Sequence, residues 1–166
     1  MLTYDEALAF LFPRTTTIKF GLDTTRALLR SLGDPHTVIP AIHIGGTNGK
    51  GSVAALVAEA LSAAGWRVGL YTSPHLVSFR ERIRVDGVPI SEEAVAMWTE
   101  RMRPLVTELG ATFFEATTAM AFADFAARGA ELGDERPHAP RPHRHCVLGD
   151  GHPVHPDPLA EGHQVR

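Results

Sequence analysis

A glycine-rich segment, G-G-T-N-G-K-G-S at residues 45–52, constrains the fold of this chain more than any other feature. An apolar, β-branched run at 37–44 precedes it, and a stretch with apolar residues at helical spacing follows it up to Gly65. A second apolar run occupies residues 66–73. Strand, glycine loop, helix and strand form a βαβ unit, in which the two strands are parallel and the crossover is right-handed. We therefore expect the glycine segment at the carboxyl end of a parallel strand.

The same segment has the features of a phosphate-binding loop. Its glycines let backbone N–H groups point inward, a helix that begins near Gly51 offers its positive dipole end, and Lys50 can reach the outer phosphates. The general pattern G-x-x-x-x-G-K-[ST] fails at two positions. Ile44 occupies its first glycine position, and Gly51 separates the lysine from Ser52. A glycine-rich turn that binds nothing is the alternative.

The strands and turns predict the fold class. The run at 37–44 has no polar alternation, as in a strand covered on both faces, although Pro40 is unfavourable there. Asp86-Gly87, within the extended segment 82–90, predicts a hairpin with a type I′ turn. The prediction is therefore α/β, with a P-loop-type parallel sheet of about three strands flanked by helices.

Four helices are predicted outside the βαβ unit, at 4–12, 23–32, 91–109 and 112–129. Thr3 and Glu6 can form a capping box at the start of the first helix. Pro104 should kink or interrupt the third helix. The fourth helix is apolar over much of its circumference, so we expect it to be largely buried.

Composition excludes several classes of protein. The 166 residues suffice for one domain, and 44% hydrophobic with 21% charged residues is ordinary for a soluble globular protein. A net charge of -3 gives no basic footprint for nucleic acid. The single cysteine, Cys146, excludes a disulfide framework within the chain. The acidic N-terminal segment and the lack of about 20 consecutive apolar residues argue against secretion and a membrane span, so we expect a cytoplasmic protein.

Five motifs, including the glycine segment, stand in the order and spacing of a known family. They are K-F-G-L-D-T-T-R-A-L-L-R-S-L-G-D-P (19–35), G-T-N-G-K-G-S (46–52), T-S-P-H-L (72–76), F-x-E-R-I-x-V-x-G-x-x-I (79–90) and F-F-E-A-T-T-A-M-A-F-A-D-F-A (113–126). Together they closely resemble the folylpolyglutamate synthase and dihydrofolate synthase family of Mur-type ligases. The resemblance covers residues 1 to about 130.

The resemblance implies an ATP-dependent ligase that forms an amide bond. In this family, ATP phosphorylates a carboxylate of a pteroate or folate, and the amine of L-glutamate then attacks the acyl phosphate. Phosphorylation supplies the leaving group that a carboxylate lacks, while metal ions and a lysine offset the charge around the γ-phosphate. The implied fold is a truncated Mur-ligase-like central ATP-binding domain, the cofactors are ATP and Mg2+, and the pathway is folate biosynthesis and one-carbon metabolism. The family is usually monomeric.

The resemblance also assigns residues to the site. Lys50 is the catalytic residue, in contact with the β and γ phosphates. The ATP-binding residues are Gly46, Thr47, Asn48, Gly49, Lys50, Gly51 and Ser52. Ser52 and Ser73 are placed for Mg2+. The loop from residue 75 to residue 82 covers the pterin, and the substrate-binding residues are His75, Phe79, Arg82, Phe114 and Glu115.

The assignments outside the glycine segment have structural alternatives. Ser73, before a proline, could be ordinary turn chemistry, and His75 could simply lie on a polar loop. Phe114 could belong to the core, and Glu115 could be a solvated helix start.

The sequence changes character near residue 131. Residues 132–166 hold six of the nine histidines and six of the twelve prolines, without apolar periodicity. In the family, a buried strand ending in V-E-V-G-x-G-G, whose glutamate binds magnesium, would follow here. We expect residues 1–131 to form a partial N-terminal ATP-binding domain, and residues 132–166 to be an irregular, disordered or out-of-frame tail that cannot supply the missing strand.

A shifted reading frame is the preferred origin of this tail, because GC-rich codons read out of frame yield Arg, Pro, His, Gly and Ala. A partner-binding arm or an incidental metal site is the alternative. The metal site would use His143, His145, Cys146, His152 and His155.

The chain alone is expected to be inactive and to bind nucleotide weakly. Its small-molecule partners would be those of the parent enzyme, namely pteroate or folate, L-glutamate and ATP. Two other functions are open: a P-loop phosphotransferase, and a non-catalytic nucleotide-binding or interaction module. A phosphotransferase has no reason to carry T-S-P-H-L or E-R-I.

Overall fold

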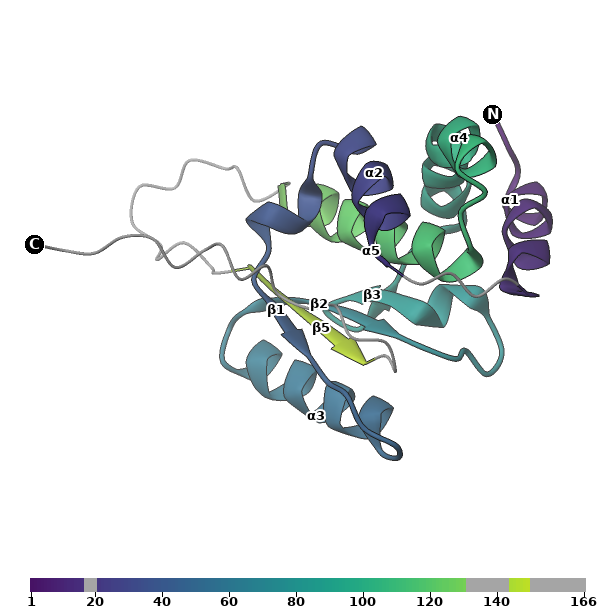
Figure 1. Ribbon diagram of the computed structural model, residues 1–166. Coiled ribbons are helices and arrows are strands. Elements are labelled where there is room, and N and C mark those ends of the chain that lie inside the picture. The colour runs from purple at the N-terminus through teal and green to yellow at the C-terminus, as the bar shows by residue number, and fades with distance from the viewer. Residues whose placement is uncertain (17–20, 131–143, 150–166) are drawn as a thin grey trace, which may run out of the picture.

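A five-stranded sheet lies between two layers of helices (Figure 1). The computed structural model describes residues 1–16, 21–130 and 144–149. The strands are β1 (Ala41–His43), β2 (Arg67–Thr72), β3 (Ile83–Val85), β4 (Val88–Pro89) and β5 (Arg144–Gly149). Their order is β1-β5-β2-β3-β4, with β1, β5 and β2 parallel and the β2-β3-β4 part antiparallel. The α/β fold class is confirmed, on a mixed sheet.

The helices cover both faces of this sheet. They are α1 (Tyr4–Leu11), α2 (Asp23–Ser31), α3 (Lys50–Ala63), α4 (Glu92–Glu108) and α5 (Phe113–Ala130), with 3-10 turns η1 (Phe12–Thr16), η2 (Pro35–Val38) and η3 (Phe79–Arg82). α3 packs on one face, whereas α5 packs on the other, beside α2 and α4, and α1 packs against α4 (Figure 1). Among the described residues, no helix combines the length and the apolarity needed to cross a membrane.

Several local predictions are confirmed. The Glu6 amide donates to the Thr3 hydroxyl at 3.3 Å, and the Thr3 amide donates to the Glu6 carboxylate at 2.7 Å, which completes the capping box of α1. Asp86 and Gly87 have φ of 50° and 75°, as a type I′ hairpin turn requires. By contrast, Pro104 does not interrupt α4, which runs through that residue, and a kink there stays a prediction.

The first strand is shorter and more exposed than predicted. A strand over 37–44 covered on both faces is wrong, because η2 extends to Val38 and the three residues of β1 are all exposed. Pro40 has no N–H to donate to a ladder, which delays the start of the strand. β1 also lies at the edge of the sheet, where β5 is its neighbour among the described strands.

β5 overturns the prediction that the region after residue 131 cannot supply a strand, and with it the expected count of three strands. It lies in the middle of the parallel part, where Cys146 is opposite both Ala41 of β1 and Gly69 of β2. Ladder groups of β1 and β2 need partners between these strands, and six residues are enough to provide them. So short a strand shows no periodicity in the sequence. Residues 131–143 and 150–166 lie outside the described residues.

α5 forms the centre of the main core, as its apolar circumference predicts. Ala116, Ala119 and Met120 are fully buried in it. Gly69 of β2 permits this close packing, because a Cβ at that position would lie 2.7 Å from the ring of Phe125. The position of the sheet relative to α5 is therefore set by a glycine.

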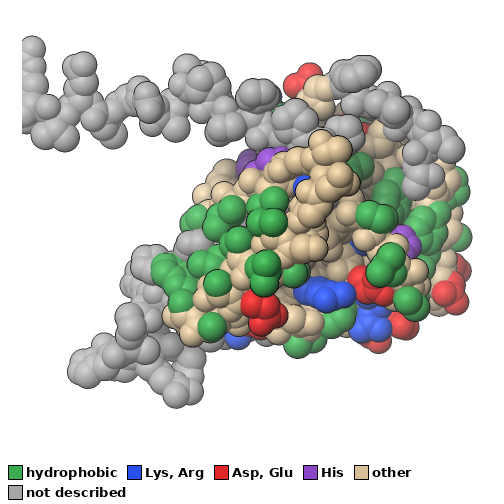
Figure 2. Space-filling model, turned by 90° about the horizontal axis from the view of Figure 1, so that it is seen from below, with side chains coloured by type: hydrophobic (Ala, Val, Ile, Leu, Met, Phe, Trp, Pro, Cys, Tyr) green, Lys and Arg blue, Asp and Glu red, His purple; other side chains and the backbone are tan. Residues whose placement is uncertain are grey.

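α3 packs more lightly on the opposite face. Ala54 and Ala58 are its buried residues, and they pack in a small cluster with Val68 of β2. Val53 and Leu56 of α3 are 47% and 70% exposed. Figure 2 views the molecule from this side and shows hydrophobic side chains scattered among charged ones. The helix that follows the glycine segment is therefore held by two buried alanines and by the partly buried Val57 and Leu61.

Candidate nucleotide and substrate site

The glycine segment joins β1 to α3 at the carboxyl end of β1. Gly46 and Gly49 have φ of 151° and 77°, which residues with side chains rarely adopt, and Gly49 is the N-cap of α3. The helix begins at Lys50, one residue before the predicted start. Because no described side chain caps α3, the N–H groups of its first turn suit an outside acceptor such as phosphate.

Lys50 folds back over the glycine segment. Its Nζ donates to the carbonyl oxygen of Gly46 at 2.7 Å and lies 3.4 Å from that of Thr47. The ammonium group therefore stands above the loop that the sequence assigns to phosphate. These bonds also help to shape the loop, so Lys50 has a structural role besides the predicted one.

Ser73 lies at the same edge of the sheet as the glycine segment. It directly follows β2, which is parallel to β1 with β5 between them. Two strand spacings separate β1 from β2, so their carboxyl ends are about 10 Å apart. Ligands of α/β sheets bind outside the carboxyl ends of the strands. The topology thus brings two predicted parts of the nucleotide site, the loop and Ser73, to one edge.

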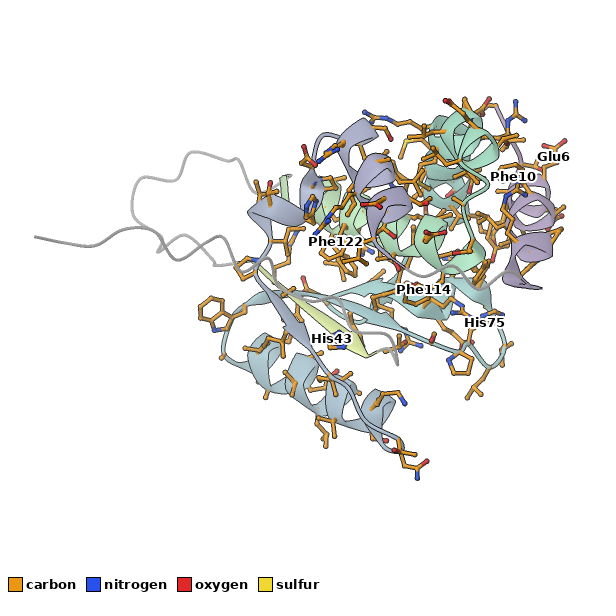
Figure 3. The ribbon with its side chains drawn as sticks, in the orientation of Figure 1. Glu6, Phe10, His43, His75, Phe114 and Phe122 are labelled. Atoms are coloured by element: carbon orange, nitrogen blue, oxygen red, sulfur yellow. The ribbon has the colours of Figure 1, made fainter. Side chains whose placement is uncertain are left out.

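An aromatic cluster forms beside this edge, around the loop that follows Ser73. The ring of His75 lies 6.0 Å from that of Phe12 and 6.4 Å from that of Phe79. Phe113 stacks on Phe12 at 5.6 Å and meets Phe79 edge-on at 6.0 Å. Figure 3 shows His75 near the N-terminal helix, away from His43 on β1. The structure therefore brings two of the predicted substrate residues together.

Arg82 joins the same cluster from the far end of the loop. It is only 9% exposed, its Nε donates to Nδ1 of His75 at 2.7 Å, and its guanidinium lies 5.0 Å from the centre of the Phe113 ring. Burial, followed by the charge of Arg82, lowers the pKa of His75. A neutral His75 is what the hydrogen bond requires, because Nδ1 must accept.

Phe12, at the start of η1, was not among the predicted site residues. No pattern in the sequence indicates that a residue at the end of α1 meets the loop after β2. Its 37% exposure and the proline that follows it are typical of an ordinary helix end. Only the tertiary structure places it against His75 and Phe113.

The other two predicted substrate residues lie outside this cluster. The Phe114 ring lies 6.3 Å from that of Tyr71, nearer the middle of the sheet (Figure 3). Glu115 accepts hydrogen bonds from the amide and the hydroxyl of Thr112, at 2.7 and 2.8 Å, and so caps α5. Its alternative role as a helix start is confirmed, although the residue is buried rather than solvated. Substrate contact by either residue stays a prediction.

The described ranges contain no group of three or more His, Cys, Asp or Glu side chains that could hold a metal ion. Two residues of the alternative metal site, His145 and Cys146, lie in strand β5. The other members, His143, His152 and His155, lie outside the described residues.

Comparison with known proteins identifies the family, although no protein-family model matches the chain. It is 42% identical over 130 residues to the dihydrofolate synthase/folylpolyglutamate synthase of Bacillus subtilis. Among solved structures, it resembles the folylpolyglutamate synthase of Thermotoga maritima, with a TM-score of 0.73 and 43% identity over 87% of the chain. Over this region, the chain belongs to the folylpolyglutamate synthase/dihydrofolate synthase family.

Family members are much longer than the present chain. The alignment covers 74% of this chain but 30% of the B. subtilis protein, and 32% of the T. maritima chain. A folylpolyglutamate synthase of Mycobacterium tuberculosis, solved in complex with ADP, matches with a TM-score of 0.72 and 37% identity over 87% of this chain and 31% of its own. The chain thus spans about a third of the length of these relatives and has part of their Mur-ligase-like fold.

Proposed function

We propose that this chain supplies the nucleotide-binding part of an ATP-dependent ligase, which joins L-glutamate to the carboxylate of dihydropteroate or folate through an acyl phosphate. One observation carries the proposal: the glycine segment lies at the same sheet edge as Ser73. The ammonium group of Lys50 lies over this segment, and no described side chain caps the helix α3 that follows it. The relative that was solved with ADP supports the same ligand class.

The glycine segment would bind the phosphates of ATP. The amides of residues 48–52 and the dipole of α3 would face the phosphate oxygens. Lys50 already stands over the loop, held by a single carbonyl at 2.7 Å and a longer contact. A phosphate oxygen is a stronger partner for an ammonium group than a carbonyl, so Lys50 would exchange the carbonyl of Gly46 for the β and γ phosphates.

The residues at this edge fit Mg2+ only as an ion bound to the nucleotide. The hydroxyls of Ser52 and Ser73 are suitable oxygen ligands, but the described residues provide no cluster of carboxylates. Phosphate oxygens and water would complete the coordination, as is usual for Mg2+. The ion would neutralise charge at the γ-phosphate, and Lys50 would share that role.

The aromatic cluster would take the ring system of the substrate. Phe79 and Arg82 lie against Phe113, and the ring of His75 lies against that of Phe79, in the loop that follows Ser73 at the edge where the phosphates would lie. Flat aromatic rings prefer such offset and edge-on neighbours. The substrate carboxylate would then extend toward the glycine segment.

Three further proposals come with this function. Residues 1–131 would form most of the ATP-binding domain, to which β5 adds a strand between β1 and β2. The protein would act as a monomer in the cytoplasm. Turnover by this chain alone is not expected, because the resemblance assigns the glutamate ligand of magnesium to a motif that its sequence does not contain.

Isothermal titration calorimetry tests the proposed function. We expect the chain to bind the ATP analogue AMPPCP in the presence of Mg2+, and then dihydropteroate. A non-catalytic module would bind the nucleotide but not dihydropteroate. A phosphotransferase would also transfer phosphate from ATP to an alcohol or a second nucleotide, a turnover that the proposed function does not expect of this chain alone.

A further inference from the structure

Glu81 of the E-R-I motif holds the backbone of the loop after β2. One carboxylate oxygen accepts from the amide of Leu76 at 3.0 Å, and the other accepts from the amides of Val77 and Ser78 at 3.2 and 2.9 Å. Three consecutive N–H groups thus converge on one side chain. Such hydrogen bonds to an ionised acceptor are stronger than those between neutral groups.

The hydrogen bonds keep this carboxylate ionised. They lower the pKa of Glu81, with the amides of Leu76 and Ser78 as the largest causes. The same residue completes a capping box with Ser78 at the start of η3. Glu81 therefore fixes both the tip of the loop and the turn that follows it.

The loop tip that Glu81 fixes exposes apolar side chains. Leu76 and Val77 are each 91% exposed, although the loop around them is anchored by the hydrogen bond between His75 and Arg82. Packing does not hold these two side chains. They directly follow His75 of the aromatic cluster, in the loop that leaves the sheet at Ser73.

We propose that Glu81 is a positioning residue for substrate binding: by fixing the amides of residues 76–78, it holds Leu76 and Val77 as apolar contacts for the ring system of the pteroate or folate. This inference rests on the proposed function. It gives the glutamate of the E-R-I motif a role that does not involve contact with the substrate. The exposed apolar pair would lose its exposure when the ring lies against it.

The test compares Glu81→Ala and Glu81→Gln in the full chain with Glu92→Gln. Glu92 is a matched control, because it is an exposed glutamate near the loop that pairs with Arg80 at 3.4 Å and accepts from none of the loop amides. In Glu81→Ala, hydrogen exchange at residues 76–78 should accelerate at least about tenfold and dihydropteroate affinity should fall about tenfold. Glu81→Gln should show smaller changes in exchange and in dihydropteroate affinity than Glu81→Ala, because its amide oxygen can still accept hydrogen bonds from the loop. AMPPCP affinity should stay within about twofold in all three variants.

A second variant keeps the inference testable if Glu81→Ala does not fold. In Leu76→Ser/Val77→Ser, exchange at residues 76–78 should be unchanged while dihydropteroate affinity falls, because the amides keep their acceptor and only the apolar contacts are lost. Unchanged dihydropteroate affinity in this variant or in Glu81→Ala, with the wild type binding both ligands, overturns the inference alone. A wild-type chain that binds neither AMPPCP nor dihydropteroate overturns the proposed function as well.

Discussion

The two loops at the carboxyl edge of the sheet are held in different ways. The glycine segment at 45–52 is shaped mainly by its backbone, through glycines with positive φ, and one side chain, that of Lys50, donates to its carbonyl groups. The loop at 74–82 is held by side chains, through the carboxylate of Glu81 and the rings of Phe12 and Phe113. A ligand can therefore reshape the first loop at low cost, whereas the second is preorganised for its ligand.

The largest expected effect is a loss of nucleotide affinity when the glycine segment is changed and the second loop is not. Lys50→Ala should weaken AMPPCP binding by about 1.5–3 kcal/mol, or roughly ten- to a hundredfold, because a charge-assisted contact is lost. Calorimetry measures this loss, and hydrogen exchange at residues 76–78 should not change. Arg30→Ala is the control, since Arg30 is exposed on α2, on the other face of the sheet. Equal AMPPCP affinity of Lys50→Ala and the wild type would show that Lys50 does not bind the nucleotide.

The backbone of the glycine segment gives the next effect. Gly49→Ala should reduce the free energy of unfolding by about 1–2 kcal/mol, because alanine is strained at a φ of 77°. Gly51→Ala is the matched control, since that glycine has no positive φ and open space where a Cβ would lie. Urea denaturation should show Gly51→Ala to be at least as stable as the wild type. Equal destabilisation by both substitutions would contradict the left-handed role of Gly49.

Phe12 tests the side-chain packing of the second loop. Phe12→Ala should cost about 1 kcal/mol of folding stability, from the lost ring contacts with Phe113 and His75. It should accelerate hydrogen exchange across residues 74–82 without changing AMPPCP affinity. Phe10→Ala, in the preceding helix α1, is the control, because the guanidinium of Arg14 lies over the ring of Phe10 at 3.9 Å. The packing account fails if both variants accelerate exchange at the loop equally.

The smallest expected effect is a dependence on pH. The pKa of His75 is lowered from its ordinary value of 6.5, so the folded protein binds this proton less readily than the unfolded chain does. The stability that neutral His75 contributes is therefore complete above pH 6.5 and is lost as the pH falls below it. A protonated Nδ1 of His75 can also no longer accept the hydrogen bond from Nε of Arg82.

Urea denaturation between about pH 7.5 and about pH 5.5 measures this dependence. The wild type should lose more stability than His75→Gln over this range, and exchange should accelerate at residues 74–82 but not at 45–52. An identical pH dependence in both proteins would show that His75 does not titrate in this range.

The elements that the sequence predicted well depend on local chemistry. The capping pair Thr3 and Glu6, the turn at Asp86-Gly87 and the helix that begins at Lys50 each follow from neighbouring residues. The glycine segment is of the same kind, since glycines and a lysine at fixed spacing define it. Its position at the end of β1 could therefore be predicted.

The elements that were missed depend on contacts between distant residues. β5 is too short to show periodicity, and it forms because β1 and β2 both present parallel edges to it. The exposure of β1 follows from its place at the edge of the sheet. Phe12 acquires its role only through His75 and Phe113, which folding brings to it. Glu81 is the exception, because its capping box with Ser78 is local and the spacing S-x-x-E could have indicated it. The surroundings of the aromatic cluster were therefore predicted less completely than those of the glycine segment.

A titration followed by amide NMR tests the central claim, that two separately held loops serve one site for ATP and a carboxylate substrate. AMPPCP with Mg2+ should shift the amide signals of residues 46–52 and Ser73, and leave those of residues 76–78 nearly unchanged. Dihydropteroate, added next, should shift the amides of residues 75–82. Shifts by AMPPCP that spare residues 46–52, or by dihydropteroate that spare residues 75–82, would contradict the account.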